Sequence, residues 1–147
     1  MSLLWKIATE SGDIEVHRGV MVANDMVMDD TAVNHVHSRS QSEGYGTHWT
    51  TDPKWAHAYS QGALRSTEVD HERPTTGVVV HATVSPEHID PTSRRFSPNA
   101  DSFDKSEVVL KKGAPVKVHG YTATYSDPTE EYDETPVHHP REAEGVA

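Results

Sequence analysis

Residues 77–84 read GVVVHATV and form the strongest strand pattern in the chain. Their β-branched side chains favour extended backbone, and the run of valines predicts a strand that is partly buried on both faces. Residues 12–20 (GDIEVHRGV) alternate apolar and polar side chains and predict a second strand. Residues 107–125 (EVVLKKGAPVKVHGYTATY) predict two further strands joined by a Lys-Gly-Ala-Pro turn. The fold is therefore expected to be built mainly from strands.

The clearest helix pattern covers residues 51–63 (TDPKWAHAYSQGA). Thr51 or Asp52 can cap this helix, and Pro53 suits its first turn. Trp55, Ala56 and Tyr59 recur at helical spacing. Elsewhere the signal is weak: residues 3–11 fit a strand or a short helix equally well, and residues 21–42 predict a loop with room for one short helix. Residues 65–75 predict an exposed loop, and residues 85–106 predict a long one.

The order of these elements favours an α+β fold over a parallel α/β fold, because the strands do not alternate regularly with helices. A length of 147 residues suits one domain. We assign that domain to residues 1–126. The last segment, residues 127–147, holds seven acids and one base and has few apolar side chains. Such a segment buries too little surface to offset the entropy of ordering, so it is expected to be a disordered acidic tail.

Composition excludes several function classes. The formal net charge of -10 argues against general nucleic-acid binding, which depends on neutralising phosphates. The absence of cysteine excludes disulfides and thiolate metal sites. The first residues do not form a signal peptide, and no apolar run approaches membrane-spanning length. We therefore expect a cytoplasmic monomer that has no membrane partner.

Three short segments contain residues suited to chemistry. Arg18 precedes Gly19 at a strand end, where a guanidinium can grip phosphate and glycine lets a ligand approach the backbone. Thr50 offers a hydroxyl between an aromatic residue and a helix start. Glu107 opens an apolar strand after the long loop. Each has an ordinary alternative, namely a turn, a helix cap and a solvated rim residue.

Taken in this order and spacing, HRG, HWTTDPKWAHAY and SEVVLKKGAPVKV resemble the ADP-ribosyltransferase superfamily in its Arg/Ser/Glu branch, over roughly residues 14–120. The resemblance implies an ADP-ribosyltransferase-like split antiparallel β-sheet with one or two short helices. It also implies NAD as co-substrate and transfer of ADP-ribose to a macromolecular acceptor. The negative charge of the chain favours a protein over a nucleic acid as that acceptor, although a basic patch near Arg94, Arg95 and Lys105 could serve a nucleic acid. The size would suit a small toxin or a phage-type effector.

The resemblance also implies a role for each matching residue. Arg18 and Gly19 would hold the NAD phosphates or the nicotinamide-side ribose. Thr50 would take the place of the family's first serine and position the catalytic carboxylate. Glu107 would stabilise the positive charge that develops at the ribose carbon as nicotinamide leaves. Trp49 and Tyr59 would line the nicotinamide side, with core packing as the alternative for both.

Phe103 and Lys105, which precede Glu107 in the chain, bear on which acceptor is modified. Phe103 lies in the loop where the family often carries an aromatic that meets the acceptor. Lys105 stands where arginine-modifying members carry Glu or Gln, and a cation there would repel an arginine acceptor. An NAD glycohydrolase on the same fold and a non-enzymatic binding domain stay open as alternatives. Eleven histidines include a His-x-His pair, His35 and His37, but no third ligand follows from the spacing, so we expect no metal site.

Overall fold

The computed structural model describes residues 12–22, 29–61, 75–90, 106–126 and 135–147. The strands are β1 (Ile14–Val22), β2 (His48–Thr50), β3 (Thr75–Val84), β4 (Glu107–Val109), β5 (Pro115–Ser126) and β6 (Val137–Val146). The helices are α2 (Asp29–Glu43) and α3 (Pro53–Ser60), with a short 3-10 turn η2 (Pro86–His88) after β3.

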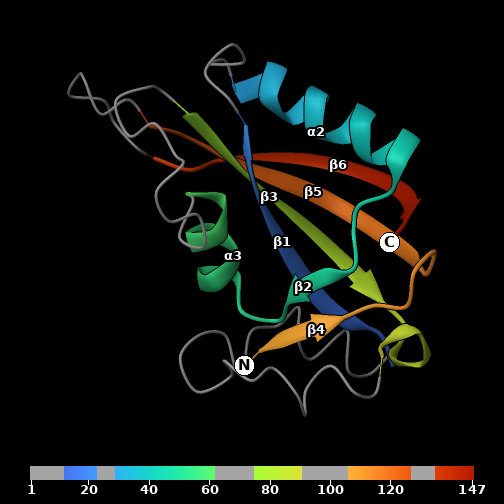
Figure 1. Cartoon of the computed structure of the whole chain (residues 1–147). Coiled ribbons are helices and arrows are strands. Elements are labelled where there is room, and N and C mark those ends of the chain that lie inside the picture. Colours follow the sequence, from blue (N-terminus) through green and yellow to red (C-terminus); the bar gives the residue numbers. More distant parts are fainter. Residues whose placement is uncertain (1–11, 23–28, 62–74, 91–105, 127–134) are drawn as a thin grey trace.

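These strands form one six-stranded sheet in the order β4-β2-β1-β3-β5-β6 (Figure 1). Every neighbouring pair is antiparallel. The expectation of an α+β fold without a parallel sheet is therefore confirmed. The strand over residues 77–84 lies inside β3, between β1 and β5, and its valines are buried. The two strands expected within residues 107–125 are β4 and β5.

The two helices cover opposite faces of this sheet. Val33 and Val36 of α2 pack into the same core as the even-numbered residues Val16 and Val80 of β1 and β3. The helix α3 instead lies against the odd-numbered Gly19, because successive side chains of a strand point to opposite faces. In Figure 1, α2 runs along β5 and β6, whereas α3 lies beside β1. We call these the α2 face and the α3 face.

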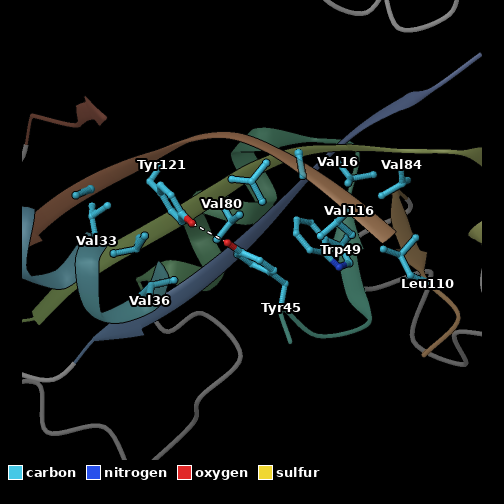
Figure 2. Close-up of a cluster of buried hydrophobic side chains, with 14 of the residues drawn as sticks. Val16, Val33, Val36, Tyr45, Trp49, Val80, Val84, Leu110, Val116 and Tyr121 are labelled. Atoms are coloured by element: carbon cyan, nitrogen blue, oxygen red, sulfur yellow. Dashed lines mark hydrogen bonds between the residues drawn. The ribbon is translucent and has the colours of Figure 1, made fainter. Parts of the chain in front are cut away.

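The core on the α2 face contains a buried tyrosine pair. The hydroxyls of Tyr45 and Tyr121 are hydrogen-bonded at 2.9 Å (Figure 2). His37 of α2 bonds the Tyr121 hydroxyl through Nδ1 at 2.8 Å. Burial raises the pKa of Tyr121, since a phenolate there would lose its hydration. His37 thus joins α2 to β5, and Tyr45 joins the segment after α2 to β5, by polar contacts within an otherwise apolar layer.

Helix α2 is longer than the sequence indicated, because it spans 15 residues. Its buried stripe consists of Ala32, Val33 and Val36, and most of its other side chains are polar. So narrow a stripe gives little periodic signal, and packing on the sheet supplies the stability that intrinsic propensity does not.

The prediction of a disordered tail over residues 127–147 is wrong for its second part. Residues of β6 pair with β5 from Pro115↔Val146 to Ala123↔Val137. Alternate residues of β6 are partly buried, whereas their neighbours are exposed. An edge strand gains backbone hydrogen bonds with few buried side chains, and composition alone does not reveal this. The sheet therefore extends beyond residue 126, which we had taken as the end of the domain.

Candidate functional site

The three segments that carry the candidate residues lie side by side in the sheet. Glu107 of β4 is directly opposite Thr50 of β2, and Thr50 is opposite His17 of β1. The neighbour of His17 in the chain is Arg18. Segments separated by up to 89 positions in sequence therefore meet on three adjacent strands, β4-β2-β1.

The pleat nevertheless separates Arg18 from the other two residues. Residues directly opposite each other in antiparallel strands point to the same face, so Glu107, Thr50 and His17 share the α3 face. Arg18 is opposite Val80 and points to the α2 face. The structure brings Thr50 and Glu107 together, and it places His17 rather than Arg18 beside them.

Thr50 helps to set the course of the backbone where β2 ends. Its side chain is fully buried, and its Oγ1 accepts a hydrogen bond from the backbone N–H of Asp52 at 3.1 Å. The Asp52 carboxylate in turn accepts from the backbone N–H of Lys54 at 2.9 Å and caps α3, which confirms the expected helix start. The Thr50 hydroxyl thus shapes the turn that leads into α3.

Glu107 is half-buried at the start of the edge strand β4. The preceding Ser106 accepts a backbone hydrogen bond from Thr51 at 3.1 Å, which fixes the beginning of the strand. Within the part of the chain that the structure describes, the Glu107 side chain makes no hydrogen bond and no ion pair. Its carboxylate is therefore not engaged by these residues.

Arg18 lies in a cavity of about 520 Å³ between β1, α2 and the segment before β2. The cavity is lined by Arg18, Val20, Met21, Val22, His35, Val36, Arg39, Ser40, Glu43, Gly44, Tyr45 and Gly46. The Arg18 guanidinium donates one hydrogen bond, from Nη1 to the carbonyl oxygen of His48 at 2.7 Å. Burial lowers the pKa of Arg18, because the cation has lost much of its hydration. A bound anion would replace the favourable interactions with water that the Arg18 guanidinium has lost.

Gly46 provides the space for that guanidinium. A Cβ added there would lie 2.8 Å from Cζ and 2.9 Å from Nη2 of Arg18. Gly46 also has a φ of 99°, which side-chain-bearing residues rarely adopt. The glycine in the YGTHW segment is thus part of the arginine site, a role that the sequence alone did not indicate.

Gly19 has a different role from the one expected. A Cβ at this position would lie 2.0 Å from the carbonyl oxygen of Ala56 and 2.6 Å from the backbone nitrogen of Ser60, both in α3. The backbone that approaches Gly19 is therefore a helix of the same chain. Gly19 faces α3, away from the cavity that contains Arg18.

The aromatic candidates divide between core and helix surface. Trp49 is 2% exposed, and its Nε1 donates to the carbonyl oxygen of Gly46 at 2.8 Å, so it is a core residue. Tyr59 stacks near Trp55 on α3, with ring centroids 6.0 Å apart. Phe103 and Lys105 lie outside the described residues.

A histidine network occupies the α3 face and was not foreseen from the sequence. His17 and His81 are bonded through their Nδ1 atoms at 2.7 Å, and His81 Nε2 bonds Thr122 Oγ1 at 2.7 Å. Thr122 also contacts His138 Nδ1 at 3.3 Å. Burial lowers the pKa of both His17 and His81 to about 4, which keeps the pair neutral near pH 7. The four residues come from four neighbouring strands, so only the pairing register could have revealed them.

The histidine pair singled out by sequence lies on α2 instead. His35 lines the Arg18 cavity, whereas His37 bonds Tyr121. Across the described ranges, no group of three or more His, Cys, Asp or Glu side chains could hold a metal ion. Neither described helix is long and apolar enough to cross a membrane.

The chain matches no protein-family model, no curated protein and no solved structure.

Proposed function

We propose that this chain is an NAD-dependent mono-ADP-ribosyltransferase. It would cleave the bond between nicotinamide and ribose and transfer ADP-ribose to a macromolecular acceptor, a protein rather than a nucleic acid. The observation that carries this proposal is the adjacency of β4, β2 and β1, which bear Glu107, Thr50 and Arg18. Their order in the sheet brings together three segments that the resemblance had selected from the sequence.

The two charged residues suit the roles assigned to them. A half-buried guanidinium that lines a cavity favours a phosphate-bearing ligand. The Glu107 carboxylate has no partner among the described residues, so it is available to stabilise positive charge at a ribose carbon. The split of the sheet that the resemblance implies belongs to this proposal too. The six described strands form one continuous sheet, so this part of the proposal rests on the resemblance alone.

One observation argues against a single cleft that contains both Arg18 and Glu107. Arg18 points to the α2 face and Glu107 to the α3 face. The proposal therefore requires that NAD, or the Glu107 side chain, reach around the β4 edge of the sheet. In the described sheet β4 is the outermost strand on this side, so no further strand lies between Glu107 and that edge.

The same separation favours a second candidate function, a domain that binds an anionic ligand without turning it over. In that case the Arg18 cavity would be occupied, and Glu107 would be a rim residue. An NAD glycohydrolase differs from the transferase only in using water as the acceptor.

Labelled NAD distinguishes these candidates. Label on a macromolecule supports the transferase, free ADP-ribose with nicotinamide supports the glycohydrolase, and no turnover supports the binding domain. We expect Glu107→Gln to lower the rate of nicotinamide release on the order of 100-fold or more, because a carboxylate that stabilises the transition state is lost. Glu142→Gln is the matched control, since it removes an exposed carboxylate from β6. Full activity of Glu107→Gln would contradict the mechanism.

A further inference from the structure

Thr122 of β5 carries a hydroxyl that is hydrogen-bonded to an imidazole on the neighbouring strand. Its Oγ1 lies 2.7 Å from Nε2 of His81 on β3. The same oxygen lies 3.3 Å from Nδ1 of His138, the residue directly opposite Thr122 in β6. Thr122 is half-buried and His138 is exposed, so among the described residues the hydroxyl is approached from the β6 side. A hydroxyl paired with an imidazole in this way is the arrangement that activates serine and threonine as nucleophiles.

A second imidazole holds that base in place. His81 Nδ1 lies 2.7 Å from Nδ1 of His17 on β1, and His17 Nε2 lies 3.5 Å from Oε1 of Glu15. The rings of His17 and His81 meet edge to face, with centroids 4.9 Å apart. Burial lowers the pKa of His81 to about 4, so this imidazole is neutral near pH 7 and has a lone pair with which to accept a proton.

The hydrogens of this group can be ordered so that every contact has one donor and one acceptor. Neutral His81 then donates from Nδ1 to Nδ1 of His17, which leaves its Nε2 to accept from the Thr122 hydroxyl. His17 carries its own hydrogen on Nε2, which faces Glu15. The reverse order would turn a lone pair of His17 towards the Glu15 carboxylate, so the first order is favoured. His81 is thus placed as a base for Thr122, and His17 fixes its orientation.

Two irregularities of strand pairing lie beside this group. The β3–β5 register shifts between His81 and Ala82, and the β5–β6 register shifts between Val118 and Gly120. Such irregularities re-aim side chains and are common next to active sites. The group therefore stands where the described sheet departs from regular pairing.

We propose that Thr122, His81 and His17 form a nucleophilic site that cleaves neutral carboxylic esters. Thr122 Oγ1 attacks the carbonyl carbon of the ester, and the hydroxyl proton passes to His81 Nε2. The bond from that carbon to the alcohol oxygen breaks, the alcohol leaves with this proton, and the acyl group stays on Thr122. Water then attacks the acyl group and gives a proton to His81, which returns it to the Thr122 oxygen as the acid departs.

The charges around the site favour a neutral substrate. Glu15 stands at the far end of the group, and the chain has a formal net charge of -10, so a phosphate ester would be repelled. The inference goes beyond the proposed function, because none of Thr122, His81 and His17 has a role assigned towards NAD.

The test treats the whole chain with p-nitrophenyl acetate and measures release of p-nitrophenolate together with peptide mass spectrometry after acid quenching. We expect an acetyl group on Thr122. Thr122→Ser should keep acetylation at this position because it keeps the hydroxyl, whereas Thr122→Val should abolish it. His81→Gln should lower the rate of acetylation on the order of 100-fold, because an amide does not take up the proton.

A second threonine–histidine pair on the same face supplies the matched controls. Thr83 Oγ1 lies 3.1 Å from Nε2 of the exposed His119, but no further side chain among the described residues bonds His119. Thr83→Val and His119→Gln should therefore keep acetylation of Thr122 within about twofold of wild type, since this pair lacks an orienting group.

The positioning role of His17 is tested by two substitutions that differ in hydrogen bonding. His17→Asn keeps an oxygen that accepts from His81 Nδ1, and it should retain most of the acetylation rate. His17→Leu removes the acceptor and should lower the rate on the order of tenfold or more. Equal rates in the two variants, with thermal unfolding showing both to be folded, would overturn the role of His17.

The Thr122 variants keep the test decisive even if a substitution of His81 or His17 disturbs folding, because Thr122 is only half-buried and both replacements are close in size. Acetyl groups on histidine or lysine alone would overturn the proposal, and so would an unchanged rate in Thr122→Val. Loss of acetylation in His138→Gln but not in His81→Gln would overturn the assignment of His81 as the base. Cleavage of NAD is expected to be unchanged in Thr122→Val, so the ester site and the transferase fail or stand separately.

Discussion

At the scale of single residues, the arginine site depends on the absence of a side chain at Gly46. The guanidinium of Arg18 lies against the Cα of Gly46, in the space that a methyl group would fill. Both residues were visible in the sequence, and Arg18 was selected as a phosphate ligand. Their contact was not predictable, because it joins β1 to a turn more than 25 positions later.

Substitution of Gly46 by alanine tests this contact. We expect Gly46→Ala to lower the free energy of unfolding by about 2 kcal/mol, because it combines a disfavoured positive φ with displacement of the flexible Arg18 guanidinium from its hydrogen bond to the His48 carbonyl. Gly113→Ala is the matched control, since Gly113 has a φ of 80° and open space where its Cβ would stand. That variant should lose only about 1 kcal/mol. Equal losses in urea unfolding of the two variants would contradict the steric part of this account.

At the scale of elements, β6 closes the sheet and fixes neighbouring turns. Tyr45 donates its backbone N–H to the carbonyl oxygen of Val146 at 2.7 Å. Ala147 accepts from Gly113 at 3.0 Å and donates to Ala114 at 2.8 Å. The end of β6 thereby holds both the segment that leads to Gly46 and the turn between β4 and β5.

Deletion of residues 137–147 is therefore expected to lower the stability of the fold strongly. The truncated chain should unfold with a midpoint lowered by more than about 10 °C, because it loses the β5 pairing and the backbone bonds beyond it. Thermal unfolding followed by circular dichroism measures this. The double variant Glu142→Gln and Glu144→Gln alters the charge of β6 while keeping the strand, and it should unfold close to the wild-type midpoint. A truncated chain as stable as the full one would mean that this segment behaves as the acidic tail its composition indicated.

The elements differ in how well local sequence determines them. The helix α3 was predictable from Asp52 and Pro53, because capping depends on neighbours in the chain. The strands β3 and β5 were predictable from their valines. The strand β6 was not, since its stability comes from pairing with a distant strand. For the same reason, the sequence identified the strands that carry Arg18 and Glu107 but not the faces to which the side chains of Arg18, Thr50 and Glu107 point.

At the scale of the whole molecule, the sheet separates two kinds of interior. The α2 face is largely apolar and contains the arginine cavity, whereas the α3 face contains the neutral pair His17 and His81. Because burial lowers the pKa of both histidines to about 4, protonation of either one is opposed by folding.

Stability should accordingly fall as the pH is lowered. An unfolded histidine takes up a proton near pH 6.5, whereas these two in the folded chain do so only near pH 4. The pair therefore contributes its full stability above about pH 6.5 and loses it progressively between about pH 6.5 and 4. Urea unfolding between about pH 6.5 and 5, above the range of ordinary carboxylates, should show this slope, and His81→Gln should reduce it. A free energy of unfolding that does not change over this interval would contradict the neutral pair.

Because the pairing of β1 with β3 is unbroken, the number of residues in β1 determines which of its side chains point to each face of the sheet. Nine consecutive pairs, from Ile14↔Val84 to Val22↔Thr76, run without interruption. Inserting or deleting one residue within β1 would invert every side chain beyond it, so Arg18 would meet α3 and Gly19 would face the cavity. The arginine site and the α3 packing surface would then be lost in one step. A one-residue change in the length of β1 would therefore disrupt both faces together unless a β-bulge absorbs it, whereas a substitution can alter one face alone.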